Sequence, residues 1–163
     1  MAKHVNPIPE GFHTATPYLT VQDGAQAIDF YKRAFGAKEV MGMKGPDGKI
    51  SHAEIKIGDS IIMLSAASSA GELRTPQSLG GSTVSILLYL ENVDETFKQA
   101  LSAGAKQIMP LENMFWGDRY GRLTDPFGHS WSLAQHIEDV APAEMEKRAK
   151  EAMAKQAHRT QTA

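Results

Sequence analysis

Hydrophobic and polar residues alternate in several short segments of the first half of the chain. Alternation with a period of two indicates β-strands, and apolar residues three to four positions apart indicate a helix. The segments with strand-like alternation are 13–21, 38–44, 50–57 and 60–65. Residues 25–35 have the helical spacing, and Gly36 follows at the position where a helix ends. The first half therefore predicts the order β-α-β-β-β.

The same order is predicted a second time after a small, polar linker at residues 66–81. The second set of expected strands covers 82–90, 106–110, 118–124 and 130–133, with a helix from Asn92 to Gly104 between the first two. Val21 matches Leu90 and Leu64 matches Leu133 at the same offset along the chain. A self-match of this regularity indicates a duplicated βαβββ module, over about 13–66 and 82–137.

Residues 138–163 have a different composition, rich in Ala, Glu and Lys. Pro142 stands at an early helical position and acidic residues precede basic ones, which favours a helix. Its large apolar residues are only Met145 and Met153, so we expect a lightly packed surface helix that frays after about Gln156. The predicted organisation is one domain at 1–137 followed by a C-terminal helical extension.

Composition removes several classes of function. The formal net charge is −2, so the chain lacks the basic surface that nucleic-acid binding requires. There is no cysteine, which excludes disulfides, Cys-zinc sites and thiol catalysis. No apolar run is long enough to span a membrane, and the first residues lack the apolar stretch of a secretory signal. We therefore expect a cytoplasmic protein with no nucleic-acid or membrane partner.

The densest stretch of chemistry is Trp116–Leu133, which contains both tryptophans. Asp125-Pro126-Phe127-Gly128 is typical of a turn, because proline presets its own backbone angle and glycine tolerates the closing one. The stretch is therefore predicted to be a β-hairpin, with Trp131 on its core-facing side. His129, directly after the turn, is expected to cap or hydrogen-bond locally.

Several motifs resemble the vicinal oxygen chelate superfamily, which includes glyoxalase I, bleomycin-resistance proteins and extradiol dioxygenases. They are Pro-Tyr-Leu-Thr-Val at 17–21, Ala-Ile-Asp-Phe-Tyr-Lys-Arg-Ala-Phe-Gly-Ala at 27–37, and Gly-Arg-Leu-Thr-Asp-Pro-Phe-Gly-His-Ser-Trp at 121–131. The resemblance implies an α+β fold in which tandem βαβββ modules form a curved mixed sheet around a cavity. It also implies a homodimer with the cavities at or near the interface.

The resemblance implies where a metal would bind. Metal-dependent members use His, Gln or Glu on the first and last strands of each module, and these positions fall on Thr16, Met63, Ser85 and Ser132. Neutral hydroxyls are weak ligands and a thioether is a poor partner for a hard divalent ion. We therefore predict no metal and no other cofactor.

Strand parity predicts which side chains face the cavity instead. The expected ligand-binding residues are Tyr18, His52, Glu54, Tyr89, Trp116, Tyr120 and Arg122. Aromatic walls with a few polar groups suit a planar or amphipathic organic ligand. An arginine in this set can pair with a carboxylate or a phosphate of such a ligand.

Alternatives remain for each of the sharper candidates. His52 and Glu54 are weak candidates for a general base and its orienting partner, for half of a displaced metal site, or for a polar pair on a partly wet strand. Arg122 either binds the ligand or forms a salt bridge with Asp118 or Asp125 in the hairpin. Trp116 either contacts the ligand or anchors a dimer interface.

The preferred hypothesis is a metal-independent protein that binds a small aromatic or amphipathic molecule, with sequestration as the role that the resemblance implies. The first alternative is a metal-dependent lyase, isomerase or dioxygenase of the same superfamily with displaced ligands. The second alternative is a non-catalytic structural or regulatory dimer. The sequence names neither the ligand nor a reaction.

Overall fold

The computed structural model describes residues 5–67 and 73–161, and it contains the two predicted modules. The first module consists of β1 (Tyr18–Val21), α1 (Gly24–Phe35), β2 (Lys38–Lys44), β3 (Ile50–Ile57) and β4 (Ser60–Ala66). The second consists of β5 (Ser85–Tyr89), α3 (Val93–Ala103), β6 (Lys106–Asn113), β7 (Asp118–Thr124) and β8 (Ser130–His136). The linker contains α2 (Pro76–Leu79), and α4 (Pro142–Gln161) follows the second module.

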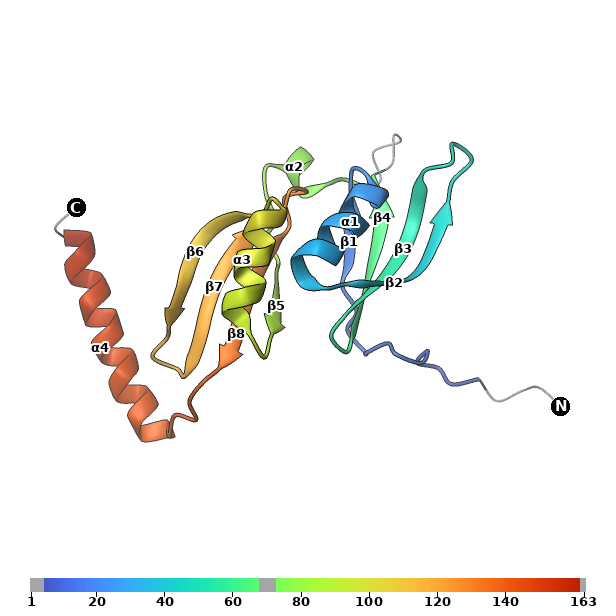
Figure 1. The fold of residues 1–163 in the computed structure, drawn as a ribbon. Helices are drawn as coiled ribbons and strands as arrows, with labels where there is room; N and C mark the ends of the chain where they lie inside the picture. Colours follow the sequence, from blue (N-terminus) through green and yellow to red (C-terminus); the bar gives the residue numbers. More distant parts are fainter. Residues whose placement is uncertain (1–4, 68–72, 162–163) are drawn as a thin grey trace.

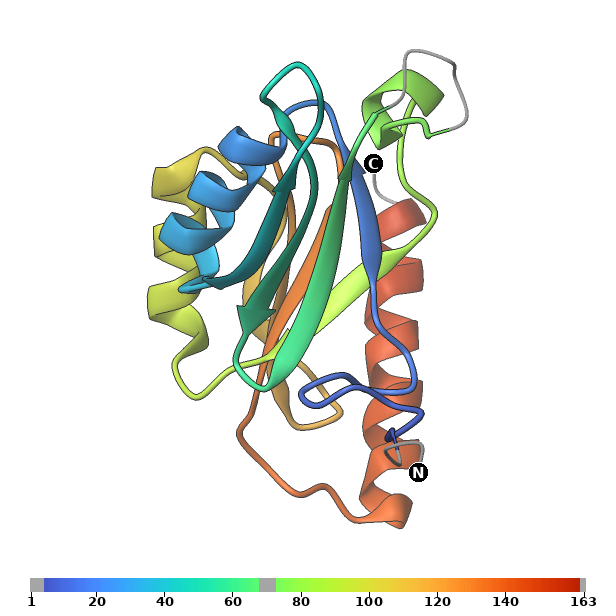
Figure 2. The same cartoon turned by 90° about the vertical axis from the view of Figure 1, so that its right-hand side faces the viewer.

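Each module forms one mixed, four-stranded sheet, which confirms the predicted fold class. The strand orders are β1-β4-β3-β2 and β5-β8-β7-β6, with the first two strands of each sheet parallel and the others antiparallel. The sheets lie side by side, with β1 and β5 as the edge strands nearest the junction (Figure 1). Helices α1 and α3 cover the same side of the two sheets (Figure 2). The opposite sheet faces carry the candidate site, and we call them the open faces.

The strand registers confirm that the two modules are equivalent residue by residue. Leu19 pairs with Leu64 in the first sheet, and Leu88 pairs with Leu133 in the second. On the neighbouring strand, Leu64 lies opposite Ala53 and Leu133 lies opposite Gly121. Because side chains alternate along a strand, the residues on either side of Ala53 and Gly121 point to the open faces.

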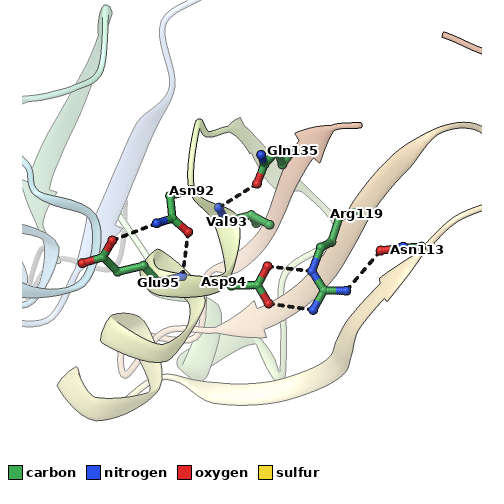
Figure 3. Close-up of polar contacts among 7 residues, drawn as sticks. All are labelled: Asn92, Val93, Asp94, Glu95, Asn113, Arg119 and Gln135. Carbon is green, nitrogen blue, oxygen red and sulfur yellow. Dashed lines mark hydrogen bonds and ion pairs between the residues drawn. The ribbon is translucent and has the colours of Figure 1, made fainter. Parts of the chain in front are cut away.

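Helices α1 and α3 lie within one residue of the ranges that the sequence predicts. Asp23 caps α1 by accepting hydrogen bonds from two backbone amides, and Gly36 ends it with a φ of 66°. Asn92 caps α3 through the backbone amide of Glu95, while the Glu95 carboxylate accepts from the Asn92 side chain (Figure 3). The Asn92 oxygen satisfies the Glu95 amide, one of the donors that the first helical turn leaves without a partner, and the bond between the two side chains holds the cap in place.

The core lies between the two helices and the sheet faces beneath them. Val21, Ile55 and Leu64 from the first sheet are fully buried there, as are Trp131 and Leu133 from the second. The prediction that Trp131 belongs to the core is therefore confirmed. Its ring lies 4.8 Å from that of Phe35 of α1, between ring centroids, so one core joins the two modules.

Several boundaries differ from the prediction, and one helix was not predicted. Strands β5 and β8 cover Ser85–Tyr89 and Ser130–His136 instead of 82–90 and 130–133, and α4 continues to Gln161. Strand β1 begins at Tyr18 instead of residue 13, because Pro17 has no N–H to donate to a ladder. Strand β6 continues past Pro110 to Asn113, as an edge strand with register irregularities can. Helix α2 was not predicted in the linker, although Thr75 caps it and Pro76 occupies its first turn.

Helix α4 lies on the opposite side of the sheets from α1 and α3 (Figure 2). Its side chains at 142–155 are exposed or half-buried, and none is buried. Arg148, in the first half of α4, donates two hydrogen bonds of 2.8 Å to the carboxylate of Glu138, which precedes the helix. No helix in the described ranges is long and apolar enough to cross a bilayer.

Candidate functional site

A groove of about 950 Å³ lies at the junction of the two modules, between the edge strands β1 and β5. Its lining residues include Thr16, Tyr18, Leu79, Val84, Ser85 and His129. Tyr18 is 57% exposed and Val84 is 67% exposed, so apolar surface is open to solvent at this junction. Exposed apolar surface with hydroxyl groups beside it is typical of a binding site for a small organic molecule.

A row of hydroxyl groups connects the groove with the open face of the second sheet. Ser85 of β5 lies in the groove, and its Oγ is 2.9 Å from Oγ of Ser132 on β8. The Tyr120 hydroxyl on β7 is 2.8 Å from the same Ser132 oxygen. Ser130 donates to Ser85 over 3.3 Å and accepts from Nη2 of Arg122 over 3.4 Å. We call these five residues the Arg122–hydroxyl row.

The open face of the first sheet carries a smaller polar group. The Tyr18 hydroxyl is 2.9 Å from Nδ1 of His52, and Nε2 of His52 lies 3.9 Å from the Glu54 carboxylate. The side chains of His52 and Glu54 are 19% and 16% exposed. The three residues thus form one connected group at the solvent boundary, where imidazole and carboxylate can bind a ligand or exchange a proton.

Asp118, at the start of β7, is the centre of a third group of hydrogen-bonded side chains. Its Oδ2 accepts hydrogen bonds from the Tyr89 hydroxyl and from Nε1 of Trp116, both at 3.0 Å. Its Oδ1 accepts from Nδ1 of His136 at 2.8 Å, and Nε2 of His136 donates to Asp139 at 2.9 Å. Asp118 is 5% exposed, so these donors replace the water that the carboxylate has lost.

The hydrogen bonds around Asp118 shift the pKa values of the residues that form them. Burial alone would raise the pKa of Asp118, but hydrogen bonds from His136, Tyr89 and Trp116 outweigh it and lower that pKa from its usual value. Hydrogen bonds to Asp139 and Asp118 raise the pKa of His136, because both carboxylates favour the imidazolium. The hydrogen bond to Asp118 also raises the pKa of Tyr89. These shifts favour the form in which a charged Asp118 pairs with a charged His136.

The predicted ligand-binding residues fall into two sets. Tyr18, His52 and Glu54 lie on the first sheet, whereas Tyr89, Trp116, Tyr120 and Arg122 belong to the second module. Trp116 and Tyr120 are in edge-to-face contact, with ring centroids 5.8 Å apart. Of all seven, only Tyr18 lines the groove. Within the described part of the chain, no hydrogen bond or aromatic contact links the two sets.

The structure excludes one alternative and refines one expectation. Arg122 forms no salt bridge with Asp118 or Asp125, because those carboxylates already accept hydrogen bonds from His136, Tyr31 and Trp131. His129 does bond locally, through its backbone amide to Oδ1 of Asp125 at 2.9 Å, whereas its ring Nε2 lies 3.0 Å from the backbone oxygen of Thr20 in the other module.

His136 was given no role in the sequence analysis, and its partner could have been found. Continuing the hairpin pairing outward from its turn brings Asp118 directly opposite His136.

The positions at which metal-dependent relatives are expected to hold a metal do not suit one here. Ser85 and Ser132 are hydrogen-bonded to each other, and the Thr16 hydroxyl donates to the backbone oxygen of His13. Met63 supplies only a thioether. In the ranges that the structure describes, no group of three or more His, Asp or Glu side chains could hold a metal ion. The donor set therefore does not fit a hard divalent ion.

Comparison with known proteins places this geometry in context. An uncharacterized protein of Mycobacterium bovis, Mb0911c, is 47% identical over 128 residues, which cover 77% of this chain and 84% of that protein. The structure of the Arabidopsis thaliana At5g48480 product is 30% identical, with a TM-score of 0.63 over 76% of this chain and 98% of that one.

A bleomycin resistance determinant encoded on the transposon Tn5 has the same architecture. It is 25% identical, with a TM-score of 0.56, over 76% of this chain and 98% of its own. The family model described as Glyoxalase/Bleomycin resistance protein/Dioxygenase superfamily matches residues 11–133, which include both modules up to the middle of β8. With its two βαβββ modules and the registers that relate them, this chain belongs to the glyoxalase/bleomycin resistance protein/dioxygenase superfamily.

Proposed function

We propose that this protein binds a small aromatic or amphipathic organic molecule at the junction of its modules, without a metal ion. The observation that carries the proposal is the groove between β1 and β5, whose apolar walls meet the Arg122–hydroxyl row at Ser85. Binding sites for small organic molecules combine apolar walls with a few placed polar groups. The likeness to a bleomycin resistance determinant supports a role directed at a small molecule.

Metal independence is supported by the chemistry of the residues at the expected metal positions. Two serines, a threonine and a methionine stand there, and the two serines already satisfy each other. The alternative of a displaced metal site depends on His52 and Glu54, which lie side by side on the open face. Two ligands hold a divalent ion weakly, because stable protein sites use three or four.

A thermal-shift screen of aromatic and amphipathic compounds tests the proposal. A ligand at about 100 times its Kd is expected to stabilise the fold by about 2.7 kcal/mol, which raises the melting temperature visibly. Tyr18→Ala should abolish the shift, because it removes an aromatic wall of the groove. Val40→Ala is the matched control, since Val40 is 53% exposed on β2 and does not line the groove.

Two results would overturn the proposal. One is a screen in which no compound stabilises the wild-type protein. The other is a stoichiometric divalent ion in protein purified without added metal, provided that the ion is lost in His52→Ala or Glu54→Ala. That result would favour the metal-dependent enzyme over the binding protein.

We also propose that two chains pair through their open faces. Leu87 and Tyr89 on β5 are 45% and 62% exposed, and both point to the open face of the second sheet. Large apolar side chains that share one face favour association. Analytical ultracentrifugation should show a dimer that Leu87→Glu dissociates, whereas Ile108→Glu on β6 serves as the control. A wild-type monomer at micromolar concentration would contradict pairing.

A further inference from the structure

Arg122 has a guanidinium edge without an adequate partner. The side chain is half-buried on β7, and its Nε is shielded from water without any hydrogen-bond acceptor. On the same edge, Nη2 has only the long contact of 3.4 Å to Ser130. None of the ion pairs in the described ranges includes Arg122. A shielded donor without an acceptor destabilises the folded state, so a partner that satisfies it binds favourably.

Arg119, three residues earlier on the same strand, shows what this edge binds. Its Nε and Nη2 donate to the two oxygens of the Asp94 carboxylate at 2.7 Å and 2.6 Å (Figure 3). This is the bidentate geometry in which a planar guanidinium matches a planar carboxylate. Arg122 offers the same edge on the open face, where the protein supplies no carboxylate for it.

The hydroxyl groups beside Arg122 are arranged in a directed chain. Arg122 can only donate, so Ser130 accepts from it and then donates to Ser85. If the order continues, Ser85 donates to Ser132 and Ser132 donates to Tyr120. Each hydroxyl has one proton, and a chain that begins at a cation therefore leaves the Tyr120 proton free for an external acceptor.

The opposite charge stands at the equivalent place in the first module. Glu54 is paired across β3 and β4 with Met63, as Arg122 is paired across β7 and β8 with Ser132. An anion on the open side of the molecule is therefore attracted to the second sheet and repelled from the first. Trp116 packs edge-to-face on Tyr120, the last residue of the row, and so places an aromatic ring beside that hydroxyl-bearing side chain.

We infer that the Arg122–hydroxyl row binds the carboxylate of an aromatic acid, with Arg122 as the ion-pairing group, Tyr120 as a second donor and Trp116 beside the aromatic ring. The inference rests on the proposed function, and it extends the proposed binding site from Ser85 in the groove along the row to the open face of the second sheet. Because Nε is shielded in this conformation, the Arg122 side chain must turn outward before the acid's two oxygens can take its Nε–Nη2 edge, and the ion pair then supplies the acceptor that Nε lacks.

The experiment compares benzoate with benzamide, its neutral analogue, by NMR titration of isotopically labelled protein. The chain has two tryptophans, and the Trp131 indole is buried against Asp125, so it is an internal reference. Benzoate should shift the Trp116 indole signal saturably and leave the Trp131 signal in place. The Kd of benzamide should be at least about tenfold weaker, which corresponds to about 1.4 kcal/mol.

Variants locate the effect. Arg122→Met should weaken benzoate at least about tenfold and leave benzamide unchanged, while Arg122→Lys, which keeps the charge without the fork, should fall between. Glu54→Gln is the matched control at the equivalent position of the first sheet, and it should not weaken benzoate. If Arg122→Met fails to fold, the Kd values of Arg122→Lys and the comparison of benzoate with benzamide on the wild-type protein still test the inference.

Some negative results would overturn the inference alone, and others would also overturn the proposed function. If benzamide binds as tightly as benzoate, or if Arg122→Met binds benzoate normally, the inference is overturned while the proposed function stands. If benzoate causes no shift at millimolar concentration but neutral compounds stabilise the protein in the thermal-shift screen, the inference alone is again overturned. If neither acid nor neutral compounds bind, both are overturned.

Discussion

The hydroxyl of Tyr31 donates a hydrogen bond of 2.7 Å to Oδ2 of Asp125 and thereby joins the two modules. Tyr31 lies on α1 of the first module, and Asp125 begins the turn between β7 and β8 of the second. The same Oδ2 accepts from Nε1 of Trp131 at 2.9 Å, and Oδ1 accepts from the backbone amides of Phe127 and His129. Burial, together with the charge of Asp125, raises the pKa of Tyr31, so the tyrosine stays a donor. One buried carboxylate thus organises both the turn and the module junction.

Removal of this carboxylate should destabilise the whole chain. Asp125→Ala leaves the Tyr31 hydroxyl, the Trp131 indole and two amides without an acceptor, and we expect a loss of about 3–5 kcal/mol in the free energy of unfolding. Tyr31→Phe leaves the other three donors in place and should cost about 1–2 kcal/mol. Urea denaturation measures the loss for each variant, provided that the dependence of the unfolding free energy on urea concentration is the same as in the wild type.

The control for this prediction is Asp59→Ala, which changes an exposed aspartate in the turn between β3 and β4. Its unfolding curve should overlay that of the wild type. An Asp125→Ala protein as stable as Asp59→Ala would show that the junction does not depend on the buried carboxylate.

The local parts of this fold were predictable, and its long-range polar contacts were not. Pro126 and Gly128 identified the turn, and strand alternation placed Trp131 in the core, because both are properties of neighbouring residues. The bond from Tyr31 to Asp125 joins residues 94 positions apart, and no local pattern encodes it. The linker helix was missed because its four residues are too few to show a periodicity.

The candidate site shows the same division. Parity along β7 correctly placed Tyr120 and Arg122 on the face opposite Gly121 and Leu123, which are buried. Strand alternation predicts the face on which a side chain lies, but it does not predict the partner of that side chain. The sequence therefore allowed either a salt bridge or a ligand contact for Arg122. Only the packed structure shows that Asp118 is occupied by other donors.

The pH dependence of stability should include a contribution from His136. Its folded pKa is raised by Asp139 and Asp118, so the stabilisation is fully present below the unfolded value of about 6.5 and is lost as pH rises through the folded pKa. The stability advantage of the wild type over His136→Gln should therefore shrink as the pH rises above about 6.5. Urea denaturation at several pH values measures this difference.

His13→Gln provides the comparison, because His13 is an exposed histidine outside the Asp118 group. This variant should follow the wild-type pH profile. A difference between wild type and His136→Gln that stays constant across the range would mean that the two ion pairs of His136 do not stabilise the fold.

Helix α4 should be dispensable for the stability of the rest of the chain. Its described side chains are at most half-buried, and exposed ion pairs such as those of Arg148 contribute little. A chain that ends at Ala141 should unfold at nearly the same urea concentration as the full chain. A much lower midpoint, or a change in oligomeric state, would instead assign α4 a role in packing or assembly.

The last prediction concerns Gly121, which stands where the first module has the buried Ala53. A Cβ at Gly121 would lie 2.8 Å from Cε2 of Phe97 and 3.2 Å from the backbone nitrogen of Leu111. We expect Gly121→Ala to lower the free energy of unfolding by about 1–3 kcal/mol, because the neighbouring backbone must move. Gly42→Ala is the matched strand control, since its Cβ would meet only side-chain atoms, and it should be neutral or slightly stabilising. Equal stability of both variants in urea denaturation would show that α3 can shift away from β7 without cost.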